Sequence, residues 1–106
     1  MSETTLDQDK GRRLQDTRPL VEELNSALRR AAYLEKGSDY GGVAKEYTRA
    51  SEVALKLSEY YKSTGQAHIG TISREDWVLM TGYKNKAGVY AGKARDAKAL
   101  SNGLRV

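Results

Sequence analysis

The chain has 106 residues and a formal net charge of +4 at pH 7, which is the size of one domain with one modest core. It has no cysteine, which excludes disulfides and cysteine-based metal sites and suits a reducing compartment. No apolar run is long enough to span a membrane and the polar opening lacks a signal-peptide core, so a cytoplasmic location is expected.

The N-terminal third is predicted to form a flexible leader followed by one helix. Residues 1–16 carry mixed charge and few large apolar side chains, which is typical of a mobile segment. A helix is predicted over about 18–36, because Thr17 can cap its start and Pro19 is tolerated in a first turn. Gly37 is predicted to end the helix in the left-handed conformation. The apolar stripe of this helix is Leu20, Leu24, Ala27, Ala31 and Leu34.

A second helix is predicted over about 39–63, with Ser38 or Asp39 as its cap. Gly41 and Gly42 stand in its first turn, where each costs about 1 kcal/mol relative to alanine. Close packing at the hairpin is the simplest reason for two glycines there. The apolar stripe of this helix is Tyr40, Val43, Tyr47, Ala50, Ala54, Leu57 and Tyr61.

A third helix is predicted over about 73–101, after a loop at 65–72 that holds the single histidine. Ser73 is followed three residues later by Asp76, which is a variant of the capping box. Trp77 is expected to close one end of the bundle, with a partner anchor as the alternative. The apolar stripe of this helix is Met80, Tyr83, Ala87, Tyr90, Ala94 and Ala97.

These patterns predict an all-α fold. Seven-residue repeats and short connections are typical of an antiparallel three-helix bundle, and the packing is related to that of tetratricopeptide helices. The domain is predicted over 17–103. Alternating runs typical of strands are short and scattered, so no sheet is expected.

No chemistry is expected from this domain. The only histidine, His68, stands in the predicted loop without a nucleophile at a catalytic spacing. No phosphate-binding, hydrolase or zinc-protease motif occurs. The sequence therefore predicts no catalytic residue, no metal and no cofactor.

A second line of residues runs beside the core stripe of the third helix, and its counterpart runs along the flank of the second helix. Small residues predominate in both lines, and cations edge the first. A shallow groove between two helices with a floor of small residues can accept an amphipathic helix. The residues predicted to form this groove are Ala44, Thr48, Ser51, Leu55, Lys84, Gly88, Ala91 and Arg95.

The C-terminal part of the chain is basic, which favours an acidic or amphipathic partner. Two alternatives remain open. The basic helix could bind nucleic acid or an anionic membrane, or the chain could be a fragment of a tetratricopeptide-type scaffold. The residues that would carry the first alternative are Lys84, Lys86, Lys93, Arg95 and Lys98.

Two segments resemble the signature of MIT domains (microtubule-interacting and trafficking). The first is the hairpin EKGSDYGGVAKEYTRASEVAL, and the second is KNKAGVYAGKARDAKAL in the last predicted helix. The resemblance covers about residues 20–100. The matching positions are Tyr40, Val43, Ala44, Tyr47, Ala50, Lys86, Tyr90, Ala94 and Lys98.

The resemblance implies a three-helix bundle that binds tail motifs of ESCRT-III subunits and recruits a larger effector, in endosomal sorting and protein transport. It implies that one class of tail docks between the second and third helices and another between the first and third. By position, Leu55, Gly88, Ala91 and Arg95 would line the first groove. Leu28 would help to line the second groove.

Overall fold

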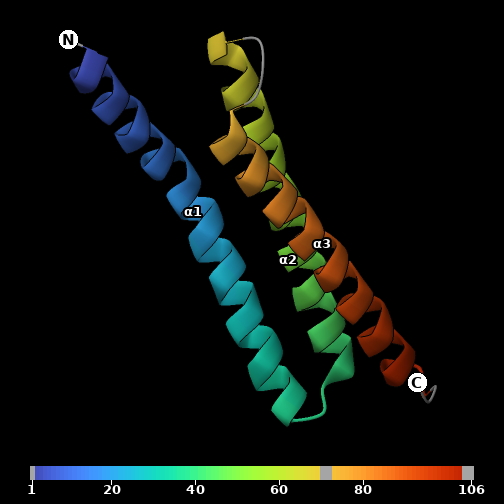
Figure 1. Ribbon diagram of the computed structural model, residues 1–106. Coiled ribbons are helices and arrows are strands. Elements are labelled where there is room, and N and C mark those ends of the chain that lie inside the picture. The colour runs from blue at the N-terminus through green and yellow to red at the C-terminus, as the bar shows by residue number, and fades with distance from the viewer. Residues whose placement is uncertain (1, 70–72, 104–106) are drawn as a thin grey trace.

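The chain folds into three helices. The computed structural model describes residues 2–69 and 73–103, with side chains described over 15–64 and 73–103. The helices are α1 (Ser2–Lys36), α2 (Tyr40–Ile69) and α3 (Arg74–Ser101). Successive helices run antiparallel, and α2 packs against both of the others (Figure 1). The described part of the chain has no strand, so the predicted all-α three-helix fold is confirmed.

The first helix begins much earlier than predicted. α1 runs without a break through Pro19, whereas the sequence predicted a leader over 1–16 and a helix over about 18–36 with Thr17 as its cap. Thr17 is only 4% exposed and lies inside the helix, so it is not the cap. An interior proline costs a helix about 3 kcal/mol. The Tyr60 hydroxyl on α2 donates to the Asp16 carboxylate at 3.0 Å, which links α1 to α2 beside the proline. A hydrogen bond contributes about 0.5–1.5 kcal/mol, so this contact offsets only part of that cost.

The turn between α1 and α2 is tight, and its caps differ partly from the prediction. Ser38, not Gly37, takes the left-handed conformation, with a φ of 59°. Asp39 caps α2, because its Oδ1 accepts a hydrogen bond from the amide of Gly42 at 3.1 Å. A Cβ on Gly42 would lie 2.9 Å from Leu34 Cδ1, so the close packing predicted at this hairpin is confirmed.

The second helix ends later than predicted, and the third begins where predicted. α2 continues through Gly65 to Ile69, because a single glycine inside a helix costs only about 1 kcal/mol. His68 is therefore helical, although its side chain and residues 70–72 of the predicted loop lie outside the described parts. Ser73 caps α3, since its Oγ accepts the amide of Asp76 at 3.2 Å.

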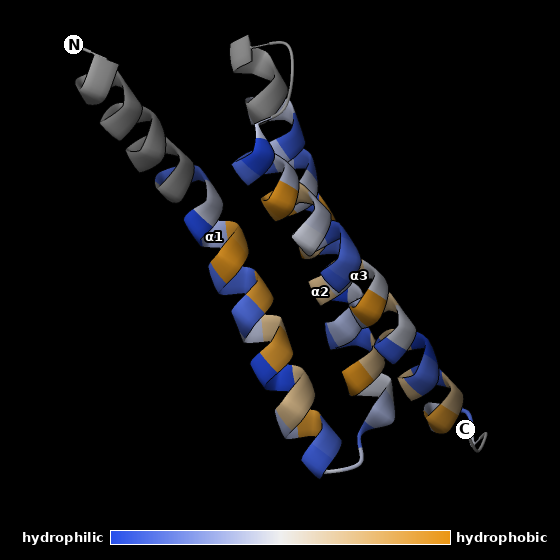
Figure 2. Ribbon diagram, viewed as in Figure 1, coloured by the Kyte–Doolittle hydropathy of each residue, from blue (hydrophilic) through white to orange (hydrophobic). Residues whose placement is uncertain are grey.

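The core lies along α2 and follows the predicted stripes. Many of its members are alanines, which let the helix axes come close. Leu57 is fully buried, and Val53, which the stripes omitted, is 1% exposed. On α1 the apolar residues form orange bands along the described stretch (Figure 2). The buried apolar residues are Leu24, Ala27, Ala31, Val43, Ala50, Val53, Ala54, Leu57, Ala87, Ala94 and Ala97.

α2 lies between α1 and α3. Among the described residues, no Cα atom of α1 comes within 8 Å of a Cα atom of α3. Leu28 on α1 and the tyrosines Tyr83 and Tyr90 on α3 pack half-buried against the core cluster. We call the line of contact between α2 and α3 the α2–α3 seam. One side of this seam is turned toward α1, and the other side is turned away from it. None of the described helices is long and apolar enough to cross a membrane.

Candidate functional site

Two serines on α2 form hydrogen bonds to backbone carbonyls of α3. The Ser51 hydroxyl donates to the carbonyl of Ala87 at 2.9 Å, and the Ser58 hydroxyl donates to the carbonyl of Met80 at 2.9 Å. The two serines are one heptad apart, and so are the two carbonyls, so the bonds repeat along the antiparallel pair. Side chains this small keep the helices close and leave a furrow beside the seam, which we call the α2–α3 groove.

The middle of the groove contains most of the residues predicted from the sequence. A hollow of about 280 Å³, the central hollow, lies between the two helices. Five predicted residues line it together with Lys98: Ala44, Thr48, Ser51, Ala91 and Arg95. The Ser51 hydroxyl is already engaged by α3, so Ser51 contributes shape to the groove rather than a free donor.

The groove continues in both directions along the seam. Toward the start of α2, a hollow of about 440 Å³ shares Ala44, Thr48 and Lys98 with the central hollow and reaches Gly41. Toward the start of α3, a hollow of about 160 Å³ contains the predicted residues Leu55 and Lys84. The three hollows therefore form one row on the side of the seam that faces away from α1.

Gly88 lies on the same face of α3, between Lys84 and Ala91, and is exposed. A Cβ atom at Gly88 would meet no atom within 4 Å, and the same holds for Gly82 and Gly92. The fold therefore does not require glycine at these positions, although each costs about 1 kcal/mol relative to alanine in a helix. Of the eight residues predicted to form the groove, Gly88 is the one that lines none of the three hollows.

The opposite side of the seam carries a tyrosine ladder. Tyr47 and Tyr90 stack with ring centroids 6.3 Å apart, and Tyr61 and Tyr83 stack 6.0 Å apart. Burial, followed by the neighbouring phenols of Tyr61 and Tyr90, raises the pKa of Tyr83. Burial and the phenol of Tyr47 raise the pKa of Tyr90. These half-buried rings hold α2 and α3 together, as the core stripes predicted.

The basic residues of α3 divide between the two sides of the seam. Lys86 Nζ lies 5.3 Å from the ring centroid of Tyr83, and Lys93 Nζ lies 5.5 Å from that of Tyr47. Both belong to the side that carries the tyrosine ladder. The cations that line the groove are Lys84, Arg95 and Lys98. The five residues of the basic-helix alternative therefore do not form one continuous surface.

A further hollow, of about 240 Å³, lies on the tyrosine side where α1 ends. It contains Glu35 of α1, Tyr47 of α2 and Lys93 of α3. Leu28, which the resemblance assigns to a groove between α1 and α3, is not among its residues. Leu28 instead packs half-buried against the core cluster.

Sequence reasoning missed several residues of the groove. Ser58 and Lys98 could have been found, because each stands one heptad after a predicted residue, Ser51 and Ala91 respectively. The polar rim of α2 gives no such signal, since its charged residues look like any solvated helix face. The missed groove residues are Gly41, Lys45, Glu52, Ser58, Glu59, Lys62, Met80, Ala94, Lys98, Ser101 and Asn102.

Trp77 is 52% exposed, so the expectation that it closes one end of the bundle is wrong. α3 begins only one turn earlier, at Arg74, and Val78 beside the tryptophan is 55% exposed. Trp77 stands one heptad before Lys84, which places it on the groove face of α3.

Similarity to known proteins does not identify this chain. No family model, no curated protein and no solved structure matches it. The resemblance to MIT domains rests on the residues quoted from the sequence, and membership of that family stays a prediction.

Proposed function

We propose that this chain is a non-enzymatic docking module that binds a helical or extended tail of a partner protein in the α2–α3 groove. The observation that carries the proposal is the row of three hollows along one side of the seam, with small side chains from both helices. An amphipathic helix presents apolar side chains at i, i+3 or i+4 and i+7 on one face, which suits a straight groove between two helices.

Following the MIT resemblance, we propose that the partner is an ESCRT-III-like tail and that docking recruits a larger effector to endosomal membranes through this partner. The groove lies between the second and third helices, where the resemblance implies that one class of tail docks. This position supports the assignment of the partner class. The docking proposal itself does not depend on that assignment, because the hollows would accept any helix of matching shape.

Ala91→Asp tests the docking function. Ala91 is exposed in the central hollow, so aspartate would place a charge where an apolar partner side chain is expected to bury. Affinity for a tail should fall by roughly tenfold or more while helix content stays unchanged. The measurement is a titration of ¹⁵N-labelled protein with ESCRT-III tail peptides, followed at the amides of Ser51, Gly88 and Arg95.

Val89→Asp is the matched control, because Val89 is 56% exposed on the same helix but does not line the described hollows. It should bind tails as the wild type does. Equal loss in both variants, or chemical-shift changes that avoid the groove, would show that the groove is not the docking site. Steep loss of binding with salt and indifference to tail sequence would instead favour the basic-helix alternative.

A further inference from the structure

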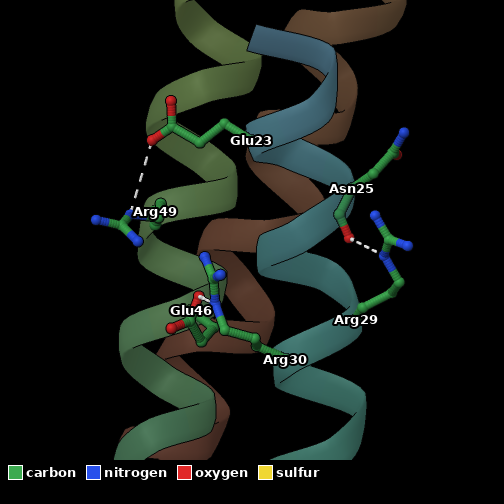
Figure 3. A network of polar contacts seen from close by, with 6 residues as sticks. All are labelled: Glu23, Asn25, Arg29, Arg30, Glu46 and Arg49. Carbon is green, nitrogen blue, oxygen red and sulfur yellow. Dashed lines mark hydrogen bonds and ion pairs between the residues drawn. The ribbon is translucent and has the colours of Figure 1, made fainter. Parts of the chain in front are cut away.

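Within the described residues, three cations of the groove have no ion-pair partner, whereas cations on the other side of α2 have one. Arg30 Nε lies 3.2 Å from a carboxylate oxygen of Glu46, and Arg49 Nε lies 3.7 Å from one of Glu23 (Figure 3). Both pairs join α1 to α2. In the described part of the chain, no ion pair or hydrogen bond engages the side chains of three groove cations: Lys84, Arg95 and Lys98.

Both halves of the groove carry more cations than carboxylates, and the larger excess lies toward the start of α2. Arg95 and Lys98 line the central hollow, where Glu52 is the one acidic residue. Lys98 and Lys45 line the adjoining hollow toward Gly41, where none of the described lining residues is acidic. This half of the groove therefore presents three cations against one carboxylate to whatever lies in it.

The other half of the groove carries two cations, Lys62 and Lys84, against the carboxylate of Glu59, and it also holds the larger apolar side chains. Leu55 on α2 is 47% exposed and lines the hollow that also contains Met80. Trp77, 52% exposed, lies one heptad before Lys84 on the same face of α3. Large exposed apolar side chains rimmed by polar residues are typical of interaction surfaces, and tryptophan is enriched among residues that dominate binding.

We propose that the partner is an acidic amphipathic helix with a fixed polarity. One end of it carries carboxylates that pair with Arg95 and Lys98, and the other end carries large apolar side chains, one that packs against Leu55 and one that packs against Trp77. This inference rests on the proposed docking function. It is supported by charge complementarity to the half with the larger excess of cations and by the large exposed apolar side chains of the other half.

The cations of the groove select partners mainly by repelling basic helices. Exposed ion pairs at the rim add little affinity, whereas lysines of a basic helix placed over Arg95 and Lys98 would be repelled. Lys86 and Lys93 do not share in this selection, because they lie over the tyrosine rings on the opposite side of the seam.

The test uses the full chain and three designed helical peptides. The peptides share one apolar stripe of leucine and alanine and carry Glu, Gln or Lys at the flanking positions of one end. The wild type should bind the Glu peptide about three- to tenfold more tightly than the Gln peptide and the Lys peptide more weakly still, at low salt. Dissociation constants come from fluorescence anisotropy, and ¹⁵N chemical shifts map the site.

A charge-swapped double variant makes the test specific. Arg95→Glu with Lys98→Glu should invert the order, so that the Lys peptide binds best. Lys86→Glu with Lys93→Glu changes the net charge equally on the other side of the seam and should preserve the wild-type order. Circular dichroism checks that both variants keep their helix content.

The outcomes separate the two proposals. If no peptide perturbs the groove residues, the docking function itself fails. If peptides bind in the groove but the Gln or Lys peptide binds as tightly as the Glu peptide, docking stands and the acidic partner is overturned. Inversion by both double variants would show that overall charge, rather than the groove, selects the partner. Loss of Glu-peptide binding in Trp77→Ala and Leu55→Ala supports the apolar end, and unchanged binding refutes it.

Discussion

At the scale of single residues, the glycines of this chain have different reasons to be small. A Cβ on Gly42 would lie 2.8 Å from Asp39 Oδ2 and 2.9 Å from Leu34 Cδ1. A Cβ on Gly82 would meet nothing within 4 Å. Gly42 makes room for the α1–α2 hairpin. Gly82 lowers the helix propensity of α3, although no neighbouring atom requires a glycine there.

Alanine substitution should therefore act in opposite directions at these two sites. Gly82→Ala should raise the free energy of unfolding by about 1 kcal/mol, which is the gain in helix propensity. Gly42→Ala should lower it slightly, because displacing the Asp39 cap costs about 1 kcal/mol and moving Leu34 adds to that cost, which together exceed the gain in helix propensity of about 1 kcal/mol. Urea unfolding of the two variants measures both values. If Gly42→Ala were more stable than the wild type, the hairpin would have room for a Cβ atom at position 42, contrary to these distances.

At the scale of elements, the tyrosine ladder makes the α2–α3 pair sensitive to alkaline pH. The pKa values of Tyr83 and Tyr90 are raised in the folded state, chiefly by burial. As pH rises past about 10, the unfolded chain releases these protons first. The stabilisation from the neutral phenols is therefore complete below about pH 10 and is lost as pH rises toward the higher pKa values of the folded state.

Replacing Tyr83 and Tyr90 with phenylalanine should reduce this alkaline loss, because phenylalanine cannot ionise. The measurement compares the free energy of unfolding at about pH 8 and about pH 11 for the double variant and the wild type. Tyr33→Phe is the control, since Tyr33 is 78% exposed and lies outside the ladder. If Tyr33→Phe reduced the loss as much as the double variant, the ladder would not be its source.

At the scale of the whole molecule, one core joins the three helices through α2. Leu57→Ala should lower the free energy of unfolding by about 2–5 kcal/mol, because Leu57 is fully buried in the cluster. This is a large part of the about 5–15 kcal/mol that stabilises a typical domain. Because the core is shared, unfolding followed by circular dichroism and by Trp77 fluorescence should coincide.

Leu55→Ala is the control for that prediction, since it makes the same change two residues away on the same helix. Leu55 is 47% exposed and lines the groove, so its loss should change stability by only about 0.5 kcal/mol or less. It should nevertheless weaken tail binding. Comparable destabilisation by both variants would mean that the α2–α3 groove is part of the core.

The sequence by itself determined that there are three helices and most of the apolar residues that each one buries, with Val53 as the omission. Helical periodicity fixes which residues share a face, so the core stripes and most of the central hollow could be predicted without a structure. The cap of α3 at Ser73 could also be predicted, because a cap depends on its neighbours in sequence.

Only the tertiary structure decided the remaining features. These are the start of α1 before Pro19, the distance between the α1 and α3 backbones, the exposure of Trp77 and the division of the α3 cations between two sides of the seam. Each depends on where a neighbouring helix lies. The local spacing of residues fixes a side chain's direction from its own helix, but the position of the next helix decides whether that side chain meets protein or solvent.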